Sequence, residues 1–157
     1  MNFFIINILL FHLFFFSSVL SQIYTPIDYN LKNIIRSKIN STERIIHALI
    51  YKFNDNDILN DFKTAKDRGI ELNFICDKNS FNYANKLTNV TLFSNMKPYD
   101  KLHAKSLLFD NKTLLIGSFN LDKSTFSTNF EIILQINEEK YIVDFIEKFN
   151  ELKKYLE

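Results

Sequence analysis

The stretch HAKSLLFDNKTLLIGSFNLDKSTFSTNFE, residues 103–131, holds most of the chemically versatile side chains of this chain. Two apolar runs, at residues 102–109 and 113–116, are rich in Leu and Ile and predict neighbouring β-strands. The sequence Asp110-Asn111-Lys112 between them favours a tight turn. We therefore expect a strand, a turn and a second strand, with polar side chains on or just beyond them.

The polar residues of this stretch suit the chemistry of a phosphodiester. His103 and Lys105 are two residues apart on the first predicted strand, so their side chains should share one face of the sheet. One group can attack phosphorus while the other neutralises the non-bridging oxygens. At the end of the second strand, Gly117 allows the backbone to approach closely, and Ser118 and Asn120 add neutral hydrogen-bond donors.

Two acidic residues of the stretch are expected to play different parts. Glu131 lies on the next predicted strand, residues 130–136. It can hold the His103 ring in one tautomer, as a carboxylate does in a Ser-His-Asp triad, or pair with a lysine across the sheet. Asp110 has the opposite strand parity to His103, so we expect it to fix the turn rather than contact a substrate.

Outside this stretch, segments with helical and strand periodicity alternate. The patterns predict helices at residues 31–39, 58–68, 79–87 and 138–156, and strands at 44–53, 70–76 and 90–93. Gly69 stands where a left-handed residue commonly ends a helix. Residues 28–157 are therefore expected to form one α/β domain in which helices cover a sheet.

The first residues are expected to serve in targeting. Residues 3–20 read FFIINILLFHLFFFSSVL, and no charged side chain occurs before Asp28. Residues 1–21 fit a signal peptide cleaved before Gln22, which predicts a secreted or periplasmic protein. The same stretch is long enough for an uncleaved membrane anchor, with residues 3–20 in contact with the bilayer. Basic residues follow it and none precedes it, so an anchor would leave the main domain on the cytosolic side. A buried core helix is the third interpretation.

Composition excludes several classes of function. The chain has 157 residues, with 19 Lys and Arg against 18 Asp and Glu, and this balance excludes a polybasic or an acidic tail. A single cysteine, Cys76, excludes a disulfide framework within one chain and a Cys-based zinc site. Because only His12, His47 and His103 are present, we expect neither a metal cluster nor a cofactor. His47 and Cys76 are expected in the core.

The pattern H-x-K-x4-D-x6-G-S-x-N, from His103 to Asn120, resembles the signature of the phospholipase D superfamily. The resemblance covers roughly residues 31–156 and is strongest to the small members with one such motif. These include bacterial secreted endonucleases and a mitochondrial cardiolipin hydrolase group. It implies a phospholipase D-like domain with a mixed β-sheet flanked by helices, and a metal-independent phosphodiesterase. The implied catalytic residues are His103, Lys105, Asn120 and Glu131; Lys105, Ser118 and Asn120 would bind phosphate, and Asp110 and Gly117 would support the site.

The resemblance also implies a homodimer. In this superfamily two His-Lys motifs build one active site, and this chain has one motif. The active site would then lie on a two-fold axis, at an interface that includes residues 117–129. His103 of one chain would attack phosphorus, and His103 of the partner subunit would protonate the leaving oxygen.

Three functions remain open from the sequence. The first is a nuclease acting on DNA or RNA, for which lysines at positions 97, 101, 105, 112 and 123 could line a groove. The second is a phospholipase D-type lipid hydrolase, similar to the cardiolipin hydrolases and anchored to a membrane such as the mitochondrial outer membrane. The animal mitochondrial group carries a zinc-finger element that this chain lacks. The third, a non-catalytic binding module, fits poorly with a complete motif. Cleavage of the first segment favours the nuclease, and its retention favours the lipid hydrolase.

Overall fold

The computed structural model describes residues 21–87, 90–94 and 97–157. The predicted targeting segment at residues 3–20 lies outside the described residues. Among the helices that are described, none is both long and apolar enough to cross a membrane.

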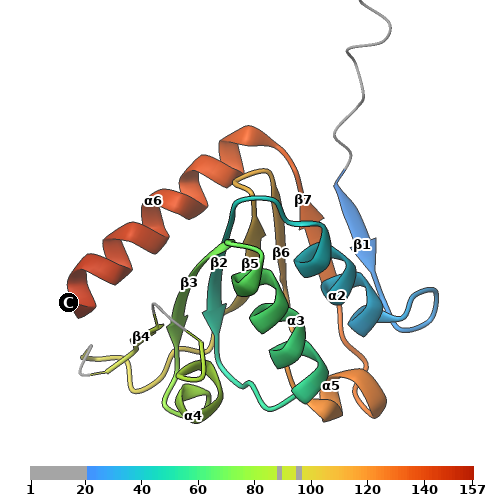
Figure 1. Cartoon of the computed structure of the whole chain (residues 1–157), viewed down its shortest axis with the longest axis horizontal. Helices are drawn as coiled ribbons and strands as arrows, with labels where there is room; N and C mark the ends of the chain where they lie inside the picture. The colour runs from blue at the N-terminus through green and yellow to red at the C-terminus, as the bar shows by residue number, and fades with distance from the viewer. Residues whose placement is uncertain (1–20, 88–89, 95–96) are drawn as a thin grey trace, which may run out of the picture.

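The centre of the fold is a seven-stranded sheet in the order β1-β7-β6-β5-β2-β3-β4 (Figure 1). The strands β2, β3 and β4 run parallel, whereas all the other neighbouring pairs are antiparallel. The expected mixed sheet is therefore confirmed. The strands are β1 (Gln22–Tyr24), β2 (Ile45–Ile50), β3 (Glu71–Cys76), β4 (Val90–Leu92), β5 (Lys105–Phe109), β6 (Thr113–Gly117) and β7 (Ile133–Ile136).

Helices cover both faces of this sheet (Figure 1). Ile35 and Phe62, from two adjacent helices, pack with Phe74 of β3 in the main core on one face. On the other face, the C-terminal helix places Phe149 against Ile75, the next residue of β3, as strand alternation requires. The helices are α2 (Leu31–Ser41), α3 (Asn56–Asp67), α4 (Phe81–Ala84), α5 (Lys123–Ser127) and α6 (Glu139–Leu156).

Residues at the two ends of α3, the helix before β3, explain where it begins and ends. The Asp55 carboxylate accepts hydrogen bonds from the backbone N–H groups of Asp57 and Ile58 and so caps the first turn of α3. Gly69 has a φ of 88°, in the left-handed region that glycine adopts without strain. The predicted end of this helix is confirmed.

Several predicted boundaries were wrong. The strand expected at residues 44–53 ends at Ile50, and the helix expected at residues 79–87 spans only Phe81–Ala84. The strand expected at residues 102–109 begins only at Lys105, because its neighbour β2 ends at Ile50, which is paired with Lys105. The strand expected at residues 130–136 begins at Ile133, so Glu131 precedes it. The fold also begins before residue 28, since β1 pairs with β7. A strand of three residues has no periodicity that the sequence alone would reveal.

Candidate active site

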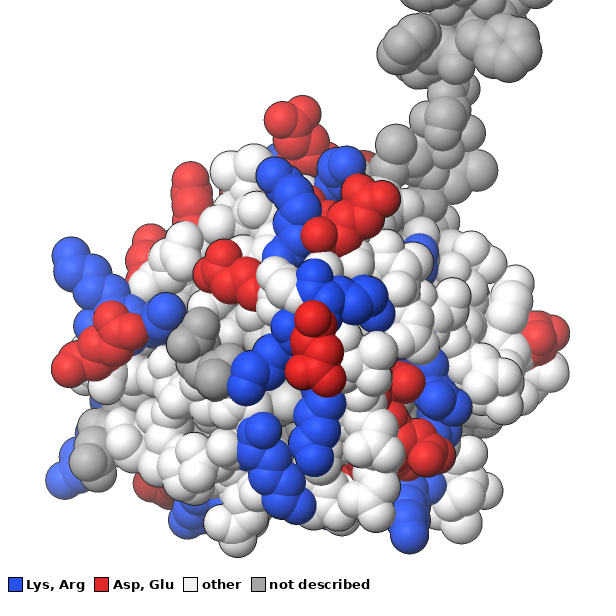
Figure 2. Space-filling model, in the orientation of Figure 1, with Lys and Arg blue, Asp and Glu red and all other residues white. Residues whose placement is uncertain are grey.

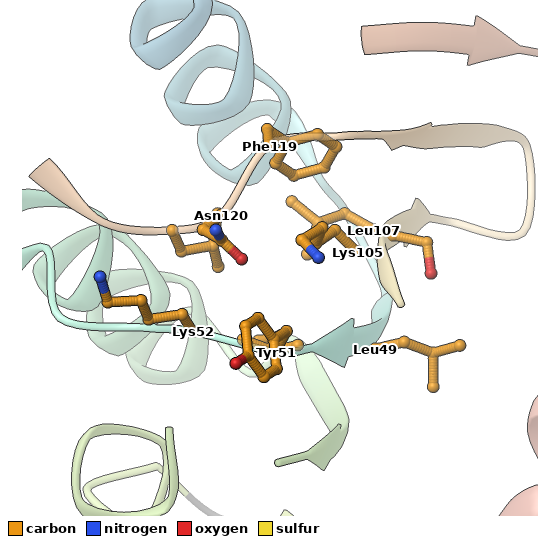
Figure 3. A pocket seen from close by; sticks show the side chains of 10 residues that line it. Leu49, Tyr51, Lys52, Lys105, Leu107, Phe119 and Asn120 are labelled. Atoms are coloured by element: carbon orange, nitrogen blue, oxygen red, sulfur yellow. The ribbon is translucent and has the colours of Figure 1, made fainter. Parts of the chain in front are cut away.

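The polar residues of the sequence pattern meet at one edge of the sheet. This edge is formed where β2 and β6 end and β5 begins, since these neighbours are antiparallel. A small pocket opens there, and Figure 3 shows Lys105, Asn120 and Tyr51 around it. The pocket is lined by Leu49, Ile50, Tyr51, Lys52, Lys105, Ser106, Leu107, Phe119, Asn120 and Leu121.

Lys105 is a buried cation at the floor of this edge. It is the first residue of β5, and it is 8% exposed. Its Nζ atom donates a hydrogen bond of 2.7 Å to the backbone oxygen of His103 and lies 4.8 Å from the centre of the Tyr51 ring. In the described part of the chain, no carboxylate lies within ion-pair distance of this Nζ. The positive charge is therefore available to an anion.

His103 lies in the loop before β5, not on the strand as predicted. Its ring is exposed and makes an edge-to-face contact with Tyr51, with ring centres 4.5 Å apart. The positive charge of Lys105, together with partial burial and the charge of Lys101, lowers the pKa of His103 below its usual value. A lowered pKa favours the neutral imidazole, which is the form that can act as a nucleophile.

Two residues that support this loop were missed in the sequence. Tyr51 contacts the side chains of both His103 and Lys105. The buried Asp77 accepts a hydrogen bond of 3.0 Å from the backbone N–H of Leu102, next to His103. Asp77 directly follows the strand predicted at residues 70–76, and Tyr51 lies near the end of the one predicted at residues 44–53. This position at a strand end was the available signal.

Gly117 and Ser118 bring β6 against the segment before β7. A Cβ atom on Gly117 would lie 2.0 Å from the backbone oxygen of Ile132, so no side chain fits there. The Ser118 hydroxyl donates a hydrogen bond to Glu131 and accepts one of 3.1 Å from the backbone N–H of Ile132. To donate to a phosphate, Ser118 must first give up its bond to Glu131.

Glu131 is buried in the segment before β7 and accepts hydrogen bonds from neighbouring side chains. Besides the Ser118 hydroxyl, its carboxylate accepts a hydrogen bond of 3.0 Å from the side chain of Asn129. Within the described chain, no hydrogen bond joins Glu131 to His103. The expected role of Glu131 in orienting the His103 ring stays a prediction.

Asn120 enters the pocket from the loop after β6 (Figure 3). Its backbone N–H donates to the Thr125 hydroxyl at 3.0 Å, which ties it to α5. Asp122 caps α5 at the N–H of Thr125 and pairs with Lys52 at 2.8 Å, which fixes this loop to the segment after β2. The side-chain oxygen of Asn120 is buried and has no hydrogen-bond partner. The amide is thus positioned at the pocket. Its free oxygen can only accept a hydrogen bond, so a phosphate oxygen there would be held by the amide NH2 group.

Asp110 lies at the opposite end of the hairpin, in the turn that the sequence predicts. It has a φ of 52° in the turn between β5 and β6, and its carboxylate accepts hydrogen bonds from the backbone N–H groups at positions 43–45. Although burial favours the protonated acid, these bonds hold the pKa of Asp110 below its usual value. Lys112 belongs to the same turn, so the expectation that it lines the groove at the site was wrong.

His47 and Cys76 lie in the core, as the sequence predicts. His47 is buried against the ring of Phe149, with ring centres 4.9 Å apart, and Cys76 is also buried. Among residues 21–87, 90–94 and 97–157, no three His, Cys, Asp or Glu side chains are grouped to hold a metal ion.

Comparisons with known proteins match this sequence to one family. A family model described as "Cardiolipin synthase, PLD-like domain" matches residues 35–153. Cardiolipin synthase A of Yersinia pseudotuberculosis is 28% identical over 111 residues, which is 65% of this chain. The chain spans about a quarter of that longer relative, as the match covers 23% of its length.

Two solved structures share the fold. NucT from Helicobacter pylori has a TM-score of 0.76 at 23% identity, with 85% of this chain and 94% of NucT covered. Nuc from Salmonella typhimurium, described as a phospholipase D family member, has a TM-score of 0.74 at 24% identity. That match covers 87% of this chain and 95% of Nuc. At these identities, the likeness shows the fold.

Proposed function

This chain belongs to the phospholipase D-like family, a branch of a superfamily of phosphodiesterases, and on that premise we propose that it is an endonuclease cleaving DNA or RNA. The observation that carries the chemistry is the buried Lys105, which has no carboxylate partner within ion-pair distance in the described chain and lies beside His103. A buried cation that makes no direct ion pair favours an anionic ligand, and a phosphodiester supplies one.

The reaction proceeds in two displacements at phosphorus. The neutral ring of His103 attacks, so that a phosphorus–nitrogen bond forms as the bond to the leaving oxygen breaks. The protonated His103 of the partner subunit gives its proton to that oxygen and becomes neutral. It then removes a proton from water, whose oxygen attacks phosphorus and releases His103 and a phosphate monoester. Lys105 and Asn120 hold the non-bridging oxygens, with Ser118 assisting.

An exposed apolar patch beside the site supports the dimer that this mechanism requires. Ile116, Phe130 and Ile132 are 40%, 63% and 48% exposed. They flank Gly117, Ser118 and Glu131 in the sequence, and a patch of this kind is typical of a surface that a partner covers. A second copy on this patch would bring the two His103 rings to one phosphate.

Mixing of active and inactive chains tests the dimer. His103→Ala protein is mixed with an equal amount of the parent and allowed to exchange subunits. At the same total protein concentration, the mixture should have about a quarter of the activity of the pure parent, because heterodimers have only one His103 ring. Dilution alone would leave about half. A fully active monomer in sedimentation at the assay concentration would contradict the shared site.

A lipid substrate is the second candidate, because the matching family model and the curated relative are both named for cardiolipin synthase. An uncleaved segment at residues 3–20 would then hold the enzyme at a bilayer. The nuclease corresponds to a cleaved signal peptide and a secreted or periplasmic location.

Parallel assays separate the two. The full-length protein, with His103→Ala as control, is incubated with labelled single- and double-stranded DNA, with RNA and with cardiolipin vesicles, each with and without EDTA. We expect cleavage of an oligonucleotide that EDTA leaves unchanged, because the reacting groups are side chains. Hydrolysis of vesicles alone would replace the nuclease by the lipid hydrolase, and a requirement for added metal would contradict the phosphohistidine route.

A further inference from the structure

A second, larger groove adjoins the pocket of the candidate active site. Lys52 belongs to the lining of both, so the groove and the pocket lie on either side of this residue. The groove has a volume of about 400 Å³, within the range of sites that hold small organic groups. Its lining comes from the segment after β2, from α4 and from the start of α5, and consists of Lys52, Asn54, Tyr83, Asp122, Lys123 and Ser124.

Tyr83 is the aromatic side chain of this groove, and its ring is held in place. Its hydroxyl donates a hydrogen bond of 2.8 Å to the side chain of Asn56, and Phe53 packs against the ring with centres 5.6 Å apart. Lys86 lies over the ring, with Nζ 4.1 Å from its centre. Because Lys86 is exposed, a flat ligand can displace it from the ring at little cost.

The charges of the groove are unequal. Lys52 pairs with the buried Asp122, which also caps α5, so that carboxylate is fully occupied. Lys123 is exposed and has no ion pair in the described chain. By contrast, the surface over α2 and α3 carries basic and acidic side chains side by side (Figure 2), among them the pair of Arg36 and Asp61 at 2.6 Å. Attraction for a polyanion is therefore local to the site and its groove.

Resting on the proposed phosphodiesterase, we propose that this groove binds the nucleotide next to the scissile phosphate and makes single-stranded nucleic acid the preferred substrate. Tyr83 would stack on the base, and Lys123 would contact the neighbouring phosphate. A base stacked on Tyr83 cannot also be paired within a duplex, so the groove selects an unpaired strand. The lining includes no aliphatic residue of the kind that commonly contacts an acyl chain, which favours a nucleotide over a lipid there.

The test measures kcat/KM on three substrates. They are a single-stranded oligonucleotide, the same strand with an abasic spacer beside the cleaved bond, and bis(p-nitrophenyl) phosphate, which reports the chemistry without a strand. Tyr83→Ala should lower kcat/KM on the intact strand about 10-fold to 100-fold, from the usual contribution of one stacked base. Activity on the abasic strand and on the small diester should stay at the parental level. Tyr83→Phe should keep most of the activity, because the ring is retained.

Matched variants identify the groove as the cause. Lys123→Gln should weaken binding of the intact strand and reduce the dependence of log K on log salt by about 0.7. Tyr141→Ala and Lys112→Gln, at exposed positions outside the groove, should behave as the parent. Equal losses for Tyr83→Ala on all three substrates, or no loss on the intact strand for either groove variant, would overturn the proposal. So would equal cleavage of duplex and single strand.

Binding separates this inference from the catalytic one. With the His103→Ala protein, fluorescence anisotropy should show that an oligonucleotide binds and that Tyr83→Ala weakens the binding. If Tyr83→Ala weakens binding while the parent hydrolyses no phosphodiester, the proposed groove is supported and the proposed phosphodiesterase activity is refuted. If the parent hydrolyses vesicles and the small diester while no oligonucleotide binds, the groove is refuted.

Discussion

One sequence pattern, residues 103–120, supplies the polar groups at both ends of the β5–β6 hairpin. The two ends differ in whether these groups have partners within the protein. At the closed end, the Asp110 carboxylate is saturated by backbone N–H groups at positions 43–45. At the open end, the amide oxygen of Asn120 is buried without a partner, and no carboxylate of the described chain lies within ion-pair distance of Lys105. Satisfied polar groups stabilise a fold, whereas unsatisfied ones are available to a substrate. The closed end therefore holds the fold, and the open end carries the chemistry.

The largest expected effect is at the open end. His103→Ala should lower kcat/KM by at least about a thousandfold, because the group that bonds to phosphorus is lost. Its melting temperature should match the parent, since the ring is exposed. Activity within about tenfold of the parent would rule out His103 as the nucleophile.

Lys105→Ala should have the second-largest effect, a loss of about 100-fold to 1,000-fold in kcat/KM. The reason is that it removes a buried cation that stabilises the charge developing on the phosphate oxygens. The matched control is Lys112→Ala at the closed end, which should keep full activity on a small diester. Comparable losses for the two lysines would show that the two ends do not differ as proposed.

Asp110→Ala should affect stability instead. We expect the free energy of unfolding, measured in urea at pH 7, to fall by about 1–2 kcal/mol, because three backbone donors lose a charged acceptor. The exposed Asp100→Ala serves as control. Because folding lowers the pKa of Asp110, its contribution is present above the usual value near 3.8 and disappears as the pH falls through the folded value. The unfolding free energies of parent and variant should therefore converge in acid, and a constant difference would contradict this.

Lys101→Gln should have the smallest effect, seen only in the pH profile. The charge of Lys101 helps to lower the pKa of His103, so its removal should raise that pKa. The acid limb of kcat/KM should then move to higher pH, because protonated imidazole cannot attack. Lys112→Gln should leave the limb in place. An unchanged limb in Lys101→Gln would show that another group controls it.

Much of this contrast could be predicted from the residues. The apolar runs predicted β5 and β6, and the residues between them predicted the turn that holds Asp110 away from the site. These predictions depend on local periodicity, which a single sequence contains.

The position of His103 depends on a strand elsewhere in the chain, and this is why it was predicted wrongly. Pairing with β2 ends at Ile50, opposite Lys105, so the two residues before Lys105 have no ladder to join. Tyr51 and Asp77 were missed for a related reason. They reach the His103 loop only because β5 lies beside β2, and β2 beside β3, and this strand order is set by long-range packing.

The contact at Gly117 has a consequence for how variation in this protein should be interpreted. The backbone oxygen of Ile132 occupies the space of any Cβ atom at position 117, so even a methyl group would push apart the segments that carry Ser118 and Glu131. In a library of all single substitutions, position 117 would therefore score as severely as a reacting residue, although it has no side chain to react. Intolerance to substitution alone would misidentify Gly117 as a catalytic residue. Loss of activity that grows with the size of the new side chain would identify a steric defect, whereas a catalytic residue is sensitive to changes in its charge or chemistry.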